Sequence, residues 1–229
     1  MSEDNLKDKI EFVEKMKQEN PRAFDFLSGS ATRTDLIEYW CNPPKEDNNC
    51  PMDYYGPDGW IRSGYLVKYL SRHIEKDAHI LEVGSGVGRN LAVLRFARFS
   101  NLAGIEVSEN AIRTMRTMIP LLDDSIIYHG PVEEWIYRMG SDSFDLIFTM
   151  AVFEHLPPQS EHVFEQVVRC MRTYLLTVED ESGVGPRHFP RNYQQVFDKF
   201  GLKQIDFEKN LVGLPKGFRL RLFRKEAKT

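Results

Sequence analysis

The chain has 229 residues, of which 41% are hydrophobic and 28% are charged, and its formal net charge is -4. These values are ordinary for a folded globular protein and exclude a disordered, fibrous or low-complexity chain. The lysines and arginines are spread along the sequence rather than clustered, which argues against nucleic acid as a partner.

The first 75 residues differ in composition from the rest and predict a cap or lid. An amphipathic helix carrying Leu6, Ile10 and Val13 opens the segment, without the layout of a signal peptide. Residues 39–60 follow and are dense in Pro, Asn, Asp and aromatics, as is typical of a long ordered loop. No apolar run reaches membrane-spanning length, so we expect a cytoplasmic protein that binds no membrane.

After a helix over 61–73, short apolar runs alternate with segments of helical period. This alternation predicts a core at 76–229 with a doubly wound, mostly parallel α/β sheet of seven strands, forming one structural domain with the cap. The expected strands are residues 79–83, 102–107, 125–129, 144–149, 173–179, 203–207 and 218–223.

Two details of this sheet follow from the segments between the strands. The short connection between the last two strands indicates a hairpin, so we expect the chain to end in an antiparallel edge strand. Val93, Phe96 and Ala97 share one helical face and predict a stripe that packs in the core.

Residues 79–90 read HILEVGSGVGRN, an apolar run followed by Gly84, Gly86 and Gly88. A dinucleotide fingerprint has the spacing G-x-G-x-x-G, whereas here the third glycine comes one position early and Arg89 stands in its place. A cofactor without a pyrophosphate does not need a helix N-terminus pressed against it. S-adenosylmethionine is such a cofactor, because it has a cationic sulfonium and an amino-acid end instead.

Glu106 ends the second expected strand, twenty residues after Gly86. An acid at the tip of this strand is placed to bind the hydroxyl pair of a ribose. Dinucleotides and S-adenosylmethionine both carry such a ribose, so Glu106 indicates an adenosyl ligand without choosing between them.

Three motifs together resemble the class I S-adenosylmethionine-dependent methyltransferases: ILEVGSGVGRN, LAGIEVS and FDLIFTMAVFEHL. Their order and separations match as well, and the resemblance extends from about Arg62 to the end of the chain. It implies a Rossmann-like methyltransferase fold and an enzyme that transfers a methyl group from S-adenosylmethionine, leaving S-adenosylhomocysteine.

The resemblance also assigns cofactor contacts to particular positions. For the methionine part of the cofactor these are Arg62, Glu82, Gly84, Ser85, Gly86 and Met150. Glu106 would hold the ribose hydroxyls and Val107 would lie against the adenine. Pro131 stands where the family often has an aspartate, which leaves a backbone contact from Val132 to the adenine.

His155 and Glu154 lie just beyond the fourth strand and are the candidate catalytic residues. Methyl transfer from a sulfonium is a direct displacement, and a hydroxyl acceptor must also lose a proton, for which histidine is a natural base. The alternative is that His155 orders its loop by bonding to a carbonyl or to the surroundings of the cofactor. Ubiquinone-biosynthesis O-methyltransferases place an acid where this chain has Ala151, so we predict no bound metal.

Residues 177–193, TVEDESGVGPRHFPRNY, follow the fifth strand and face the same edge of the sheet. They resemble a segment of a bacterial branch of small-molecule methyltransferases. The candidate substrate contacts, with two lid tyrosines included, are Tyr54, Tyr55, Glu179, Asp180, His188 and Tyr193. These side chains could instead cap helices and pair with one another.

The sequence thus predicts a methyltransferase that acts on a small polar molecule, with oxygen favoured as the acceptor atom. An N-methyltransferase is the first alternative, since the acids at 179–181 and Glu154 would suit a cationic amine. A nicotinamide-dependent oxidoreductase is disfavoured by Arg89, and a non-catalytic module that binds an adenosyl cofactor is a further alternative. The sequence makes no prediction about the oligomeric state.

Overall fold

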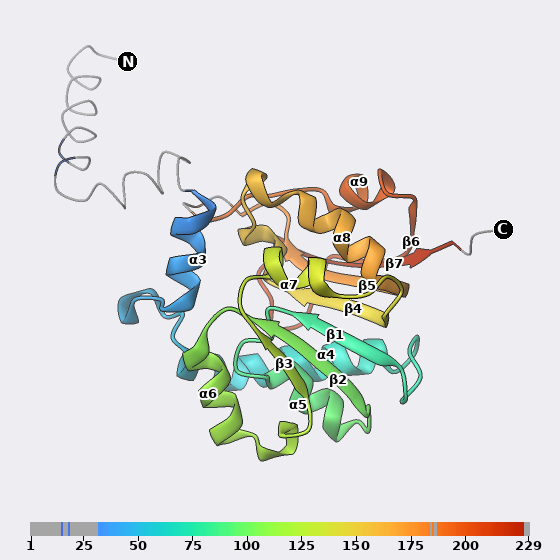
Figure 1. The fold of residues 1–229 in the computed structure, drawn as a ribbon, viewed down its shortest axis with the longest axis horizontal. Helices are drawn as coiled ribbons and strands as arrows, with labels where there is room; N and C mark the ends of the chain where they lie inside the picture. Colours follow the sequence, from blue (N-terminus) through green and yellow to red (C-terminus); the bar gives the residue numbers. More distant parts are fainter. Residues whose placement is uncertain (1–14, 16–17, 19–31, 184, 186, 227–229) are drawn as a thin grey trace, which may run out of the picture.

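The computed structural model describes residues 15, 18, 32–183, 185 and 187–226. Its centre is a seven-stranded sheet with the order β3-β2-β1-β4-β5-β7-β6 and helices on both faces (Figure 1). The strands are β1 (His79–Val83), β2 (Asn101–Glu106), β3 (Ile126–His129), β4 (Phe144–Met150), β5 (Met171–Asp180), β6 (Leu202–Glu208) and β7 (Phe218–Lys225). The expected doubly wound, mostly parallel α/β fold is confirmed.

Each face of the sheet has its own layer of helices and its own core. One core joins the sheet to α4 (Pro57–Leu70), α5 (Arg89–Phe96) and α6 (Glu109–Met118). The other joins it to α7 (Val132–Arg138), α8 (His162–Cys170) and α9 (Tyr193–Asp198). Successive residues of β1 alternate between the two cores, with Ile80 in the first and Leu81 in the second, as the period of a strand requires.

The last two strands form the expected hairpin, but their positions differ from the prediction. β7 is antiparallel to both of its neighbours and lies one place in from the edge, while β6 forms the edge. The composition of the strands explains this order. β7 buries Phe218, Leu220, Leu222 and Phe223, whereas β6 alternates half-buried and exposed positions after Leu202 and suits an edge that has one solvated face.

The expected core stripe on α5 is also wrong in part. The Phe96 side chain is 72% exposed, and the buried face of the helix carries Leu91, Ala92 and Leu94. The helix thus packs its two leucines, rather than Phe96, against the sheet.

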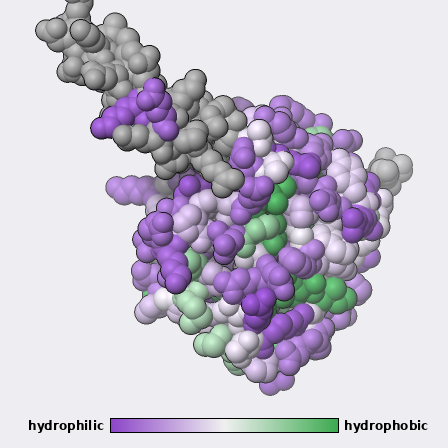
Figure 2. All heavy atoms as spheres, turned by 60° about the vertical axis from the view of Figure 1, so that its left-hand side comes forward, coloured by the Kyte–Doolittle hydropathy of each residue, from purple (hydrophilic) through white to green (hydrophobic). Residues whose placement is uncertain are grey.

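The face shown in Figure 2 is mostly hydrophilic, with apolar side chains in small areas between polar ones.

The described part of the cap is more helical than expected. α3 (Arg33–Cys41) is followed by the 3-10 helices η1 (Lys45–Asp47) and η2 (Pro51–Tyr55), so residues 39–60 are not a plain loop. α4, which lies within the predicted cap at 1–75, contributes Leu66 and Leu70 to the core of the sheet. The expected helix carrying Leu6 lies outside the described residues.

The cap is attached to the sheet at the end of β2. The Oγ of Ser108 donates to the carbonyl oxygen of Cys41 at 3.0 Å, and this places the end of α3 beside the loop that follows β2. The short 3-10 helices η3 (Pro120–Leu122), η4 (Phe153–His155) and η5 (Pro158–Ser160) complete the connections. None of the described helices combines the length and the apolar character needed to cross a membrane.

Candidate functional site

A cavity of about 330 Å³ lies where the carboxyl ends of β1, β2 and β4 meet the cap. This is the edge at which ligands bind in open α/β sheets, and the volume suits a small molecule. All nine residues that the sequence assigns to the cofactor line it: Arg62, Glu82, Gly84, Ser85, Gly86, Glu106, Val107, Val132 and Met150.

The turn after β1 has the backbone shape that its glycines allow. Gly84, Gly86 and Gly88 have φ values of 71°, 53° and 74°, which L side chains rarely adopt. A Cβ at Gly88 would lie 2.4 Å from the Sδ of Met115, so this glycine allows close packing of α6. A Cβ at Gly86 would meet no atom within 4 Å, because this residue faces the cavity.

Glu106 joins the end of β2 to this turn. Its Oε2 accepts from the backbone N–H of Gly86 at 2.6 Å, and its Oε1 accepts from the N–H of Ser108 at 2.8 Å. The side chain is buried, and burial raises the pKa of its carboxyl while the two N–H donors act to lower it. Each carboxylate oxygen has a second lone pair, so Glu106 could also accept from two hydroxyl groups in the cavity.

Glu82 lies beneath the turn in a polar network within the wall. Its Oε1 accepts from the Nδ2 of Asn90 at 2.6 Å, and the Oδ1 of Asn90 accepts from the Oγ of Ser63 at 2.6 Å. Burial raises the pKa of Glu82 to about 8. The Nε of Arg89 donates to Ser63 at 2.8 Å and its Nη1 donates to the carbonyl oxygen of Tyr54 at 2.7 Å, which ties the cap to the turn.

Two buried oxygens of the cavity wall lack a hydrogen-bond partner among the described residues: Glu82 Oε2 and Ser85 Oγ. A buried polar atom without a partner is unfavourable, and a ligand can supply that partner. A carboxylate and a hydroxyl are suited to an ammonium or amino-acid group. The residues present therefore fit the amino-acid end of S-adenosylmethionine, and Glu106 fits its ribose.

Arg62 and the other predicted contacts lie around these atoms. The Nε of Arg62 donates to the carbonyl oxygen of Gly213 in the β6–β7 connection, which holds the side chain at the cavity wall. Pro131 is the N-cap residue of α7, and Val132 is the first residue of that helix.

Most of the candidate substrate residues do not line the cavity. Tyr54 does, whereas the hydroxyl of Tyr55 donates to the carbonyl oxygen of Val87 at 3.0 Å. Tyr193 is fully buried among Phe153, Phe164 and Phe197.

The two acids at the end of β5 hold the neighbouring backbone. Glu179 is fully buried and accepts from the N–H of Val152 at 2.9 Å and of Glu154 at 3.1 Å. Asp180 accepts from the N–H of Ser182 at 2.9 Å and of Gly183 at 2.8 Å. Both therefore order the loops after β4 and β5.

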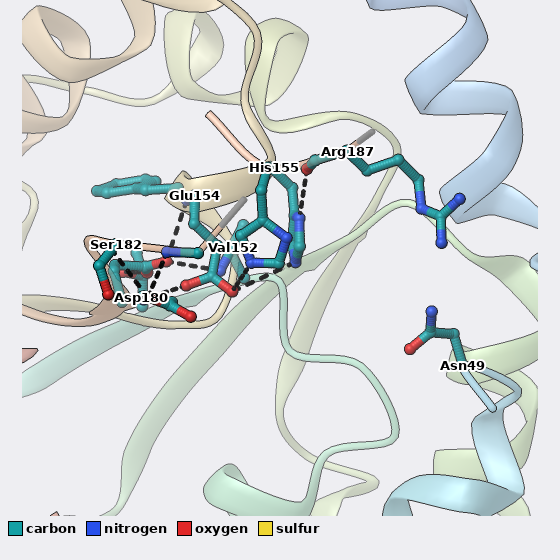
Figure 3. A network of polar contacts seen from close by, with 12 residues as sticks. Asn49, Val152, Glu154, His155, Asp180, Ser182 and Arg187 are labelled. Carbon is teal, nitrogen blue, oxygen red and sulfur yellow. Dashed lines mark hydrogen bonds and ion pairs between the residues drawn. The ribbon is translucent and has the colours of Figure 1, made fainter. Parts of the chain in front are cut away.

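Glu154, His155 and His188 form a compact cluster beside the cavity, and His155 lines the cavity itself. Figure 3 shows Glu154 next to His155 in this cluster. The Glu154 Oε1 lies 3.1 Å from the Nε2 of His188 and 3.6 Å from the Nε2 of His155. The Nδ1 of His155 is 2.8 Å from the carbonyl oxygen of Arg187, so His155 does order its loop.

Burial shifts the titration of this cluster. It lowers the pKa of His155 to about 4. Burial and the neighbouring Glu179 raise the pKa of Glu154, whose Oε2 accepts from the N–H of Asp180. Figure 3 shows the Arg187 side chain directed away from His155, towards Asn49 of the cap.

Several residues of the cavity wall were not among the contacts predicted from the sequence. Leu36, Ile37 and Trp40 of α3 line it from the cap side. The start of α3 was readable, because Thr32 and Asp35 form a capping box in which each side chain accepts from the backbone N–H of the other residue. The position of α3 over the cavity depends on long-range contacts that no local pattern shows.

Comparison with known proteins finds a family model that matches the central segment. Residues 81–174 match the family model described as a methyltransferase domain. No protein of curated function matches the chain by sequence.

Solved structures share the fold at low identity. Magnesium protoporphyrin IX methyltransferase from Synechocystis PCC 6803, with bound S-adenosylmethionine, is 11% identical, with 84% of this chain and 96% of that chain covered and a TM-score of 0.67. The PH0226 protein from Pyrococcus horikoshii OT3 is 16% identical, with 80% and 99% covered and a TM-score of 0.65. The cyclase SpnF is 12% identical, with 72% and 81% covered and a TM-score of 0.60.

These matches cover the glycine turn, the acid at the end of β2 and the loop after β4. The strand order and the antiparallel β7 agree with the fold of these structures. Residues 81–174 thus match a methyltransferase-domain model, and the described chain shares its fold with solved structures that include methyltransferases.

Proposed function

We propose that the protein is an S-adenosylmethionine-dependent methyltransferase that acts on a small polar molecule at an oxygen atom. One observation carries the proposal: the carboxylate of Glu106 lies in the cavity wall, 2.6 Å from the N–H of Gly86. The acid suited to a ribose and the turn suited to the methionine part thus form one continuous wall. The methyltransferase domain that matches residues 81–174 supports the same conclusion.

The other wall residues suit the remaining parts of the cofactor. Glu82 Oε2 and Ser85 Oγ would accept from, or donate to, its amino-acid end, and Arg62 would pair with its carboxylate. Val107 and Val132 would lie against the adenine. When bound, the cofactor supplies an activated methyl group on a sulfonium. The protein's own contribution is to hold the acceptor in line with that group.

The acceptor would lie in the part of the cavity under α3. Trp40 and His155 face one another there, with ring centroids 4.6 Å apart, and Leu36 and Ile37 complete an apolar cover. Such a cover excludes water from the reaction. A cavity of about 330 Å³ that α3 partly covers supports a small acceptor rather than a macromolecule.

The acids at the end of β5 give no support to a cationic amine as acceptor. Glu179 and Asp180 hold backbone N–H groups, as described above, and none of the acids at 179–181 lines the cavity. Glu181 pairs with Arg221 through two contacts of 2.6 and 2.8 Å. These three acids therefore lend no charge to the acceptor space, and we keep oxygen as the proposed acceptor atom.

Two observations argue against His155 as a general base. The pKa of about 4 makes the ring a poor proton acceptor near neutral pH, and one ring nitrogen is bonded to the Arg187 carbonyl. Glu154 does not line the cavity. Alignment of the acceptor, rather than proton removal by His155, is thus the main catalytic contribution in this proposal.

The proposal is tested with isotopically labelled S-adenosylmethionine and extracts of small metabolites. Label should move to a small polar compound, and mass spectrometry of the product should place the methyl group on oxygen. A labelled nitrogen would contradict the choice of acceptor atom. If the cofactor binds but no label is transferred, the protein would be a module that binds an adenosyl cofactor rather than an enzyme.

A further inference from the structure

Three side chains from two loops converge at one point beside the cavity. Glu154 and His155 come from η4 after β4, and His188 comes from the loop after β5. One ligand atom from each lies within 4.8 Å of the other two. Ala151 stands where a metal-binding acid was expected beside Glu154 and His155, and the structure brings His188 to these two residues instead.

The hydrogen bonds of His155 determine which nitrogen faces Glu154. A carbonyl oxygen only accepts, so the Nδ1 of His155 carries the hydrogen in its bond to Arg187. In the neutral ring the Nε2 then has a lone pair, and it lies 3.6 Å from the Glu154 Oε1, which is itself an acceptor. At this distance no hydrogen bond joins the two atoms, and both lone pairs are free to bind one ion placed between them.

The position of the His188 Nε2 favours a metal ion over a shared proton as the bridge between these residues. A proton bridges two atoms, whereas here the Nε2 of His188 also approaches the same Glu154 oxygen, at 3.1 Å. Ligands about 2.1 Å from a tetrahedral ion are roughly 3.4 Å apart, which is close to the two distances to Glu154. The Nε2 atoms of His155 and His188 would move somewhat closer to each other when the ion binds.

The surroundings hold these ligands as metal ligands are usually held. A histidine that binds a metal commonly donates its other N–H to a backbone carbonyl, as His155 does to Arg187. The second oxygen of Glu154 accepts from the N–H of Asp180, which leaves Oε1 directed at the two histidines. Two imidazoles and one carboxylate suit zinc, cobalt or a similar ion better than calcium or magnesium.

We propose that Glu154 Oε1, His155 Nε2 and His188 Nε2 bind one divalent transition-metal ion of the zinc type. Three protein ligands leave at least one coordination position open. Since His155 lines the cavity, that position lies next to the space assigned to the acceptor. This site is separate from the residues proposed to bind the cofactor.

The test uses the full chain, without a histidine tag, after treatment with a chelator. Cobalt(II) is titrated into the protein and followed by its visible absorption, and zinc(II) is then added as a competitor. The variants are His155→Gln and His188→Gln. His79→Gln is the matched control, because His79 is an exposed histidine at the start of β1.

The wild type and the control should bind one cobalt ion per chain, which zinc displaces. Each of the other variants should bind at least tenfold more weakly. The His188 side chain is 28% exposed, so its substitution should leave the fold intact, which a thermal melt of each variant checks. Absence of stoichiometric binding, or an affinity unchanged in both variants, would overturn the site. Because no cofactor is present, this result is independent of the methyltransferase proposal.

Discussion

Glu106 and Gly86 are separated by twenty residues, yet the Glu106 carboxylate accepts a hydrogen bond of 2.6 Å from the backbone N–H of Gly86. This bond joins the end of β2 to the turn after β1. A ligand that Glu106 holds is therefore also held against the turn, and the strength of binding should depend on both residues.

Substitution of Glu106 by alanine should weaken S-adenosylmethionine binding about tenfold or more. The reason is the loss of a charge-assisted pair of hydrogen bonds to the ribose, each worth roughly 1.5–3 kcal/mol. Glu109→Ala is the matched control, because Glu109 is an exposed acid in the first turn of α6. Calorimetric titration of the folded variants measures the effect, and equal affinities in the two would refute the ribose assignment.

The glycines of the turn should separate stability from binding when each is changed to alanine. Gly86→Ala should lower the free energy of unfolding by about 1–2 kcal/mol through backbone strain, and its Cβ should reduce cofactor affinity because it enters the cavity. Gly88→Ala should lower stability further, by roughly another 1–3 kcal/mol, because its Cβ would lie 2.4 Å from Met115 and 2.8 Å from Leu122.

Urea unfolding and calorimetric titration together check this pair of glycine variants. Gly88 does not line the cavity, so its variant should lose less affinity than Gly86→Ala relative to its loss of stability. The opposite order, with Gly86→Ala the less stable protein, would show that the turn packs differently.

Glu82 should make the stability of the cofactor-free protein depend on pH. Burial raises the pKa of its carboxyl from 4.5 to about 8 in the folded chain, with Asn90 and Arg89 acting to lower it and Glu106 to raise it. A pKa that folding raises stabilises the folded state at low pH. This contribution is complete below pH 4.5 and is lost as the pH rises through 8.

Glu82→Gln removes that titration. Relative to the wild type, the variant should become more stable as the pH increases from 5 to 8, by up to a few kcal/mol. Glu106 is present in both proteins, so its own titration largely cancels in the comparison. Unfolding free energies measured across this range should diverge, and parallel curves would place the Glu82 carboxyl in a more solvated environment.

Arg89 should stabilise the contact between cap and turn. Its bonds to Ser63 and to the Tyr54 carbonyl oxygen would both be lost in Arg89→Gln, leaving a half-buried carbonyl without a donor. We expect the free energy of unfolding to fall by about 1–3 kcal/mol. Arg113→Gln is the control, since Arg113 forms an exposed pair with Glu109 and its loss should change stability by less than about 1 kcal/mol. Similar values for both variants would contradict this role.

Local patterns were sufficient for most of the fold. Every strand was located within two residues or so, because each is a short apolar run that ends at a turn signal. The sequence also placed Gly86 and Glu106 at one edge of the sheet, because Gly86 follows β1 and Glu106 ends the adjacent parallel strand β2. The position of β7 inside the edge strand β6 could not be predicted from local patterns, because it depends on which of the two strands buries more apolar surface.

The substrate side of the site was harder to predict, for a related reason. Tyr193 was a candidate contact because of its position after β5, yet its ring packs in the core with Phe197. His188 reaches Glu154 through the path of a loop that carries no periodic pattern. Sequence spacing gives the edge of the sheet at which a side chain lies, and long-range packing decides whether that side chain faces the cavity.

Direct calorimetric titration with S-adenosylmethionine, S-adenosylhomocysteine and NAD measures which cofactor the cavity binds. We expect both adenosyl compounds to bind with one site per chain and NAD to bind far more weakly, because the turn has Arg89 where a dinucleotide site needs glycine. A preference for NAD, or no binding of either adenosyl compound, would contradict this assignment of the cofactor.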